Sequence, residues 1–176
     1  MNKRILSILL CLMLVVSLLV MAVPVNAAPA DATVTLTADK TVAKPGDEIT
    51  FTVTLGPVEA IGCLEFVIDV PAGLAVGTIT SNANAAQEIG LLKADLNDAD
   101  GTPKFTSMAD DKDGSTSTDV VLGTFTAVVK DDATGEQKVD VDSESIVSEN
   151  YDGDPVGFNF VPATVTVAGS ETTAPT

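Results

Sequence analysis

The sequence predicts an all-β protein built as a two-sheet sandwich. After an apolar N-terminal segment, it consists of short runs in which apolar residues alternate with polar ones, very often threonine. This two-residue period sorts side chains onto the two faces of a strand, whereas a helix would scatter them around its circumference. No stretch combines helical periodicity with capping residues, so a βαβ architecture is not expected. About eight or nine short strands follow one another at the spacing typical of sandwiches.

The first strands show the clearest alternation. In residues 33–37, valine and leucine alternate with threonines, and in residues 49–55 four apolar residues alternate with three threonines. The Lys-Pro-Gly-Asp sequence of residues 44–47 predicts a turn between these two strands. Residues 64–70 alternate in the same way, and the Pro-Ala-Gly sequence of residues 71–73 ends that strand. Each of these strands is therefore expected to have one buried face and one solvated face.

The middle of the chain gives weaker signals, and its end gives stronger ones. Residues 74–80 are predicted to be a short strand and residues 82–86 a loop, whereas residues 88–96 fit a helix or a strand equally well. Residues 104–108 are predicted to be extended. The remaining segments are an acidic loop at residues 110–114, the strongest strand at residues 120–129, and later strands at residues 138–141, 156–160 and 164–167.

The two ends of the chain differ from the part between them. Basic residues precede an uncharged apolar run, and small residues suited to a signal peptidase follow it. We therefore expect a signal peptide over residues 1–27 and a protein that is secreted or held at the cell surface, with no membrane insertion of the mature chain. Because the run is long enough to span a bilayer, an uncleaved anchor is the alternative. Residues 31–168 are expected to form one domain, and residues 169–176 a Ser/Thr/Pro-rich tail or linker.

The composition of the exported part limits its chemistry. With seven lysines against all 25 acidic residues, its formal charge is −18, so nucleic acid and anionic lipid are poor partners. Only Cys63 remains after cleavage, which leaves no internal disulfide. The sequence has no histidine, which excludes Ser-His-Asp and Cys-His catalysis. Carboxylate catalysis needs a paired acid and base, and no spacing singles out such a pair, so we do not expect an enzyme.

Calcium is the ion that best suits the abundant carboxylates. Residues 97–101 and 110–114 each match part of the D-x-[DN]-x-[DN]-G loop. Apolar Leu96 and Ala109 occupy the first ligand position, and neither segment has a carboxylate at the twelfth. We therefore interpret both segments as Asp-Gly turns and expect no cofactor, with calcium as the weaker alternative.

The order of these motifs resembles that of cohesin modules, which occur in bacterial cellulosome scaffolds and related cell-surface proteins. The resemblance covers nearly all of residues 31–168. It implies a jelly-roll sandwich of nine strands that binds dockerin modules on one sheet face. Dockerins are carried by secreted enzymes, mainly those that degrade plant polysaccharides. The matching segments are residues 44–47, 48–55, 61–67 and 104–110, the Asp113-Gly114 turn, residues 121–129, and a closing strand near Val165.

The resemblance also implies which residues meet the partner. In the family, dockerin contacts come from the strands that match residues 62–67 and 104–110. Glu65 matches the acidic position before the third-strand phenylalanine, and Asp110 matches the acid that closes the later strand. Each could accept a hydrogen bond from a partner, and each also fits a solvated carboxylate. The predicted contact set is completed by Phe105, Thr106 and Met108, whose register is open by one residue, and a slip of one residue would exchange their faces.

Two other functions fit the same fold. A carbohydrate-binding module would present aromatic rings to a sugar. The candidates here are Tyr151 and six phenylalanines, of which Phe51, Phe66 and Phe125 fall on apolar strand faces. A structural or adhesin domain would bind neither a sugar nor a dockerin. We favour a non-catalytic receptor for a dockerin-containing protein, with polysaccharide binding as the alternative.

Overall fold

Residues 31–168, which the computed structural model describes, form an all-β sandwich with one short helix, as the sequence predicts. The predicted signal peptide, residues 1–27, and the predicted tail, residues 169–176, lie outside the described residues. In the described part of the chain, no helix is both long enough and apolar enough to cross a membrane.

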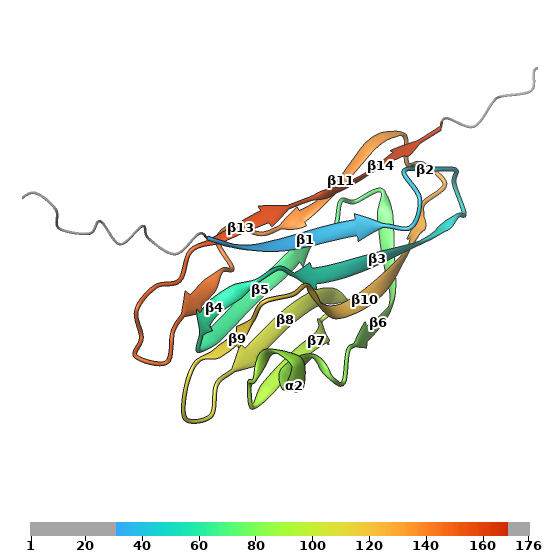
Figure 1. The fold of residues 1–176 in the computed structure, drawn as a ribbon. Coiled ribbons are helices and arrows are strands. Elements are labelled where there is room, and N and C mark those ends of the chain that lie inside the picture. The colour runs from blue at the N-terminus through green and yellow to red at the C-terminus, as the bar shows by residue number, and fades with distance from the viewer. Residues whose placement is uncertain (1–30, 169–176) are drawn as a thin grey trace, which may run out of the picture. The chain divides into compact units, whose positions relative to one another are not determined.

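The first sheet has five strands in the order β13-β1-β3-β10-β6 (Figure 1). Strand β1 runs parallel to β13, and the other neighbours are antiparallel. The alternation of the sequence sets the register, which pairs apolar Leu36 with Val53 and Phe51 with Phe125. The strands are β1 (Ala32–Ala38), β3 (Glu48–Leu55), β6 (Leu74–Ser81), β10 (Val120–Val129) and β13 (Phe158–Val161).

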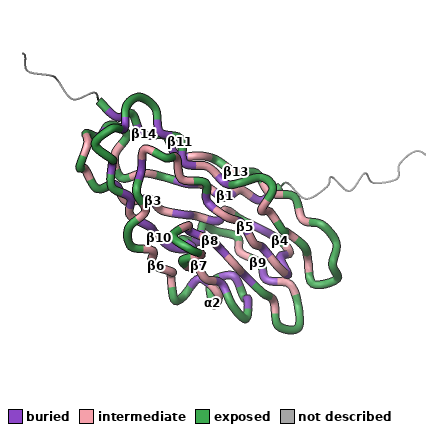
Figure 2. Tube along the Cα trace, turned by 180° about the vertical axis from the view of Figure 1, so that it is seen from behind, coloured by how far each residue is buried: buried purple, intermediate pink, exposed green. Residues whose placement is uncertain are grey.

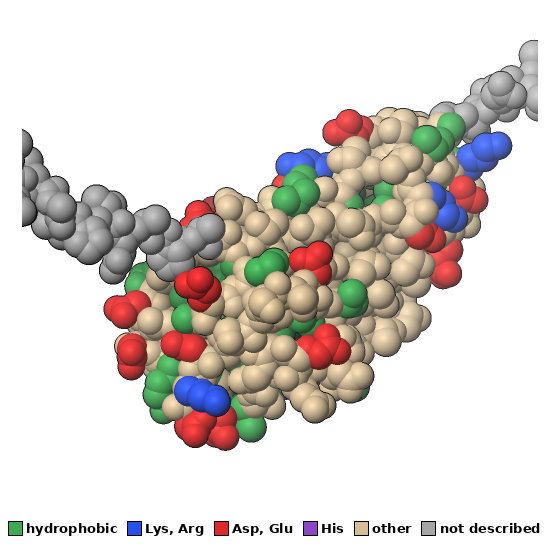
Figure 3. Space-filling model, in the orientation of Figure 1, with side chains coloured by type: hydrophobic (Ala, Val, Ile, Leu, Met, Phe, Trp, Pro, Cys, Tyr) green, Lys and Arg blue, Asp and Glu red, His purple; other side chains and the backbone are tan. Residues whose placement is uncertain are grey.

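The outer face of this sheet is rich in threonine. Its side chains are β-branched and polar, which suits a solvated strand face. In the view of Figure 3, backbone and side chains that are neither hydrophobic nor charged cover most of the surface over β1 and β3, and most acidic side chains lie toward the two ends. Threonines on four adjacent strands are direct cross-strand partners: Thr37, Thr52, Thr124 and Thr80.

The second sheet follows the order β2-β14-β11-β5-β8-β7, and β12 also pairs with β5. Strand β5 is central, because β8 lies along one edge while β11 and β12 share the other. The longer strands are β5 (Cys63–Asp69), β7 (Lys93–Ala99), β8 (Thr102–Met108), β11 (Gly135–Val141) and β14 (Ala163–Val167).

The core lies between the two sheets, where most of the longer strands bury their apolar side, and β6 buries only Leu74. Figure 2 shows buried and more exposed residues alternating along the strands, which matches the period read from the sequence. Two stacked aromatic pairs anchor the core, one from each sheet. Phe51 and Phe125 stack with ring centroids 5.0 Å apart, and Phe66 and Phe105 with centroids 5.2 Å apart.

The resemblance implied nine strands, and the described residues contain more. Four of the additional strands are two to four residues long and lie within connections, where no alternation can be recognised. They are β2 (Val42–Ala43), β4 (Val58–Ile61), β9 (Gly114–Thr116) and β12 (Val147–Glu149). Strands β4 and β9 pair only with each other.

The segment that fitted a helix or a strand contains both. Helix α2 (Ala85–Ile89) begins inside the predicted loop and ends at Gly90, whose φ of 80° is the left-handed conformation that favours glycine. Strand β7 follows, with Leu96 in the core. A tight turn at Asp100 and Gly101, both with positive φ, then connects β7 to β8.

Candidate functional site

The predicted contact strands lie side by side in the second sheet and present one continuous surface to solvent. In one rung across four strands, Glu65 pairs with Val147 of β12 on one side and with Thr106 of β8 on the other, and Thr106 pairs with Asp95 of β7. Paired residues share a face, so these side chains stand together. We name this surface the outer β5–β8 face and define it by the side chains of Glu65, Val67, Lys93, Asp95, Asn97, Lys104, Thr106, Met108 and Val147.

The structure settles which residues of β8 point outward. Thr106 is half-buried on the outer face, and Met108 is 54% exposed at the end of the strand. Phe105 is 0% exposed, because its ring stacks on Phe66 inside the sandwich. The expectation that Phe105 contacts a partner is therefore wrong. Phe105 occupies the position of the two-residue period of β8 that faces the core.

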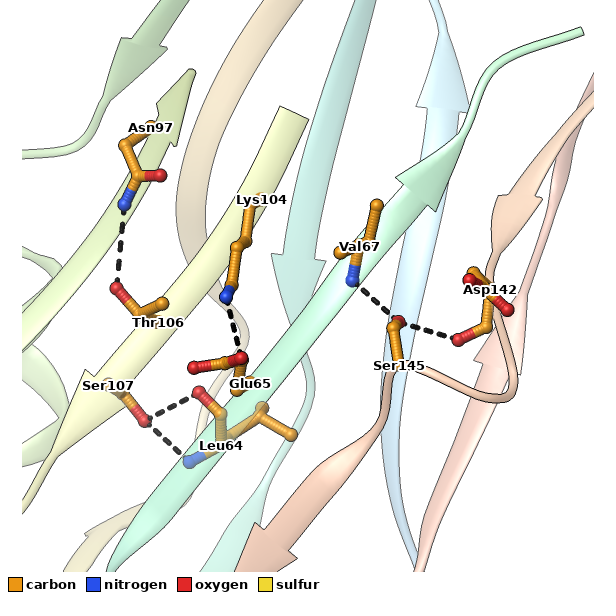
Figure 4. A network of polar contacts seen from close by, with 9 residues as sticks. All are labelled: Leu64, Glu65, Val67, Asn97, Lys104, Thr106, Ser107, Asp142 and Ser145. Carbon is orange, nitrogen blue, oxygen red and sulfur yellow. Dashed lines mark hydrogen bonds and ion pairs between the residues drawn. The ribbon is translucent and has the colours of Figure 1, made fainter. Parts of the chain in front are cut away.

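Glu65 is on the outer face, and its carboxylate already has a partner. Lys104 Nζ lies 2.6 Å from Glu65 Oε1 (Figure 4). The two residues are diagonal neighbours on adjacent strands, which long side chains can span. Lys93 and Asp95 form a second pair on β7, with 3.2 Å between Nζ and Oδ2. The acids at the centre of this face are thus matched by lysines, although the chain as a whole is strongly acidic.

Asp110 lies apart from Glu65, beyond the end of β8. It is exposed and follows Ala109, whose N–H donates to the Gly62 carbonyl at 2.6 Å. Gly62 in turn donates to the Glu149 carbonyl at 2.8 Å. A side chain at position 62 would meet backbone atoms of Asn150 at 2.4 Å, so only glycine fits there without a shift. Asp110 therefore belongs to an end of the face where two loops and β5 converge.

Two buried or half-buried hydroxyls complete the edges of β5, and sequence reasoning did not find either of them. Ser107 Oγ accepts from the Leu64 N–H at 2.9 Å and donates to the Leu64 carbonyl at 3.2 Å. These two hydrogen bonds take the place of backbone–backbone hydrogen bonds at the point where β8 diverges from β5. Ser145 Oγ accepts from the Val67 N–H at 2.8 Å and donates to the Asp142 carbonyl at 2.7 Å (Figure 4). No local sequence pattern marks a serine whose hydroxyl bonds to the backbone of a distant strand, so neither residue could be found from the sequence.

Exposed apolar side chains add to the same region. Val147 is 46% exposed in the central rung, opposite Glu65. Leu92 is 61% exposed, and its N–H donates to the Met108 carbonyl at 3.0 Å, which places it beside the end of β8. Exposed apolar groups next to satisfied polar groups are typical of protein interfaces. The outer β5–β8 face therefore presents exposed apolar side chains beside its ion pairs.

Cys63 is half-buried at the start of β5. Burial, followed by the nearby carboxylates of Glu65 and Glu149, raises the pKa of its thiol. A raised pKa keeps the thiol protonated, and the thiolate is the reactive form. We therefore interpret Cys63 as an unreactive side chain.

The described residues offer no aromatic platform for a sugar. Four of the six phenylalanines are completely buried, and Phe158 and Phe160 are packed against the core. Tyr151 is the remaining ring and is 54% exposed in the loop after β12. Its N–H donates to Asp113 Oδ1 at 2.6 Å. One exposed ring does not provide the stacking surface that flat sugar-binding sites use.

The acidic segments do not gather into an ion site within residues 31–168. No three acidic or cysteine side chains of this part of the chain lie close enough together to hold a metal ion. In the β7–β8 turn, Asp98 Oδ1 instead accepts from the Gly101 N–H at 2.6 Å. Asp113 is used in the same manner, as the acceptor for the Tyr151 N–H.

Comparison with models of known protein families gives one match. The model of the cohesin domain family matches residues 34–167. A non-cellulosomal cohesin from the archaeon Archaeoglobus fulgidus is 18% identical, with a TM-score of 0.58 over 81% of this chain and 94% of that one. The seventh ScaB type I cohesin of Pseudobacteroides cellulosolvens is 17% identical, with a TM-score of 0.59 over 82% and 97%.

A structure of a bound relative is also similar. In the type I complex of Coh-OlpA with Doc918 from Clostridium thermocellum, the matched chain is 20% identical, with a TM-score of 0.55 over 77% of this chain and 99% of that one. At these identities, likeness to the solved structures shows the fold. No curated protein matches the chain.

Proposed function

The chain belongs to the cohesin family, and we propose that it docks a dockerin-bearing protein, typically a secreted polysaccharide-degrading enzyme, to a scaffold or cell surface. Cohesin domains are non-catalytic binding modules, so the chain is not an enzyme. The observation that carries the proposal is the continuous outer β5–β8 face, built by the strands that the resemblance assigns to partner contact. The Clostridium thermocellum complex, in which a cohesin of the same fold holds a dockerin, supports this assignment.

The chemistry of the face suits a protein partner. Glu65 and Lys104 neutralise each other, and so do Lys93 and Asp95, which lowers the cost of removing the face from water compared with isolated charges. Thr106 lies between Glu65 and Asp95, where it supplies a small hydroxyl that lets a partner approach closely. A standard interface buries roughly 800 Å² on each partner.

The apolar side chains on the face supply the attractive contact. Val147 and Met108 are the exposed apolar members of the outer β5–β8 face, and Leu92 extends them past the end of β8. Desolvated anchors of this kind contribute most of the energy of an interface, while the polar groups around them exclude water and set specificity. We propose that Val147 and Met108 are such anchors, with Glu65, Thr106 and Asp110 as polar contacts.

Secretion completes the proposal. The basic residues, apolar run and small residues over residues 1–27 support export through a cleaved signal peptide. Export would bring the domain to the extracellular or cell-surface compartment in which dockerin-bearing enzymes act. The proposed module binds its partner without a cofactor of its own.

Two matched variants test the docking face. Thr106→Arg puts a long charged side chain at the centre of the outer β5–β8 face, and Thr52→Arg puts the same side chain at the centre of the opposite sheet. Both threonines are half-buried on the outer side of an internal strand. Immobilised protein is exposed to the secreted proteins of the source organism, and the captured proteins are identified by mass spectrometry.

The unmodified protein and Thr52→Arg should retain dockerin-bearing proteins. Thr106→Arg should weaken their binding by about 2 kcal/mol, which is roughly thirtyfold in Kd. Capture of no dockerin-bearing protein would contradict the proposed function. Equal loss in both variants, or loss in Thr52→Arg alone, would contradict the assignment of the face.

A further inference from the structure

The loop between β12 and β13 contains the one Asp-Pro bond of the sequence, between Asp154 and Pro155. The peptide bond before proline is a tertiary amide, and its nitrogen leaves as a secondary amine once it is protonated. Both residues are exposed, so water reaches the bond. The bond is therefore chemically susceptible to cleavage. Its surroundings decide whether the fold protects the bond or promotes its cleavage.

Asn150 surrounds Asp154 with hydrogen bonds. The Asn150 N–H donates to the Asp154 carbonyl oxygen at 2.9 Å, and this carbonyl belongs to the Asp-Pro bond. The Asp154 N–H donates to Asn150 Oδ1 at 2.7 Å. Asn150 Nδ2 lies 3.5 Å from Asp154 Oδ2. One residue thus holds the backbone on both sides of Asp154 and also approaches its carboxylate.

The far side of the bond is held as well. Pro155 forms an antiparallel bridge with Glu149, and the Val156 N–H donates to the Ser148 carbonyl at 3.1 Å. Ser148 Oγ also donates to the Val156 carbonyl. The backbone on both sides of the Asp154–Pro155 bond is therefore held by the loop, and the Asp154 carboxylate has Asn150 Nδ2 as its neighbour at 3.5 Å.

We propose that the Asp154–Pro155 bond is a self-cleavage site that the folded loop promotes. A carboxylate oxygen of Asp154 attacks the carbonyl carbon of the same residue. The bond from that carbon to the Pro155 nitrogen breaks, and the nitrogen takes a proton from the solvent. The cyclic anhydride left on Asp154 is opened by one water molecule. The products are a chain that ends in Asp154 and a chain that begins with the amine of Pro155.

The contacts assist each part of this step. Negative charge develops on the carbonyl oxygen during attack, and the Asn150 N–H is aimed at that oxygen at a distance suited to stabilising it. Attack within one residue needs no encounter, so its rate depends on orientation, which Asn150 restricts. Carboxylates also serve as nucleophiles in glycosidases and in ATPases that form an aspartyl phosphate. Because the leaving nitrogen needs a proton, cleavage should be faster in mild acid.

Cleavage would leave the domain assembled. Strands β13 and β14 lie after the bond, and they pair with β1, β11 and β2. Val165 of β14 is completely buried, and Val167 is nearly so. The fragment that begins at Pro155 is therefore held by two sheets without a covalent link, and the cut becomes visible only when the protein is denatured.

The test is incubation of the purified full chain in mildly acidic buffer, followed by intact-mass measurement under denaturing conditions. The expected result is first-order appearance of a fragment that begins at Pro155, at a rate independent of protein concentration and unaffected by protease inhibitors. Size-exclusion chromatography before denaturation should show one species. Hydroxylamine should trap the anhydride as a hydroxamate on Asp154, and the chain has no Asn-Gly bond that this reagent would also cleave.

Three controls separate promotion by the fold from ordinary acid lability. Asp154→Asn removes the nucleophile and should abolish cleavage. Asn150→Ala removes the side-chain contacts and should slow it roughly tenfold, because orientation is lost. The unmodified chain unfolded in urea at the same pH should also be slower. Cleavage that is as fast in urea as in the folded protein, or that is unchanged in Asn150→Ala with its fold intact by circular dichroism, would overturn the proposal, as would no cleavage.

Discussion

Replacing Phe105 by alanine tests the assignment of the two faces of β8. The side chain is completely buried and stacks on Phe66 with 5.2 Å between ring centroids. Truncating a buried phenylalanine to alanine removes its transfer free energy and leaves a cavity, which together cost about 3–5 kcal/mol. The lost aromatic pair accounts for roughly 0.5–1.5 kcal/mol of this. Typical domains have an unfolding free energy of about 5–15 kcal/mol. At the low end of this range the variant becomes marginally stable, and over most of the range it remains folded.

Urea denaturation measures the loss as a lower midpoint with an unchanged slope, because the surface exposed on unfolding stays nearly the same. Partner binding is then measured in the absence of urea, where Phe105→Ala should retain affinity to the extent that it is folded. Phe105→Leu is the companion variant, since leucine keeps the position apolar and fills much of the cavity. It should recover most of the stability.

The reverse pattern would refute the reasoning. If Phe105→Ala changes the free energy of unfolding by less than about 1 kcal/mol and abolishes binding, the ring faces the partner and the register of β8 is shifted by one residue. Loss of binding in Phe105→Leu with unchanged stability would lead to the same conclusion.

Four further outcomes are expected. Ser107→Ala leaves the buried N–H and carbonyl of Leu64 without their partner and should cost about 1–3 kcal/mol in urea denaturation, while conversion of Ser107 to threonine should cost less because the hydroxyl is retained. Partial burial acts to raise the pKa of Asp140, but hydrogen bonds from Lys138 and the Val141 N–H, together with the Lys138 charge, hold it below its ordinary value. A lowered pKa in the folded state stabilises the protein above the unfolded pKa, and this contribution is lost as pH falls through the folded pKa, so Asp140→Asn should flatten the acid side of the stability curve measured by urea denaturation at several pH values. A chelator should leave the melting temperature of the free protein unchanged, since the acidic side chains of residues 31–168 do not converge on one point, and a drop of several degrees would reveal a resident ion. Raising the salt concentration should slow association with a basic partner, measured by surface plasmon resonance, and leave dissociation nearly unchanged.

The sequence was sufficient for the long strands because their residues obey a local rule. Alternation in residues 49–55 requires one apolar face, and any register that buries that face puts its threonines outside. The short strands follow no such rule. Strand β12 is three residues long and exists because its backbone pairs with β5, so its position is determined by a contact distant in the chain. Helix α2, at five residues, is similarly too short to show a period.

The candidate site was predicted at the level of strands and only partly at the level of side chains. The resemblance located β5 and β8, and the pairing of Glu65 with Thr106 shows that these two residues share a face. It misplaced Phe105, because a list of contact positions does not state which ones alternate inward. The resemblance also implied that the Glu65 carboxylate is free to accept a hydrogen bond from a partner. Its ion pair with Lys104 depends on the register between two strands separated by a long connection, which no local pattern contains.

The distribution of charge explains how a strongly acidic protein can carry a protein-binding face. Residues 28–176 have a formal charge of −18, yet the central acids of the outer β5–β8 face are matched by lysines. Charges around an interface mainly change the rate of association, and at physiological ionic strength exposed charges act over only about 8 Å, so acids outside this face contribute little to the stability of the bound complex. Their contribution is to the rate of encounter and to solubility. On the proposed docking face, the stability of the complex depends on burying Val147 and Met108, so mutation can alter the rate of encounter and the stability of the complex separately.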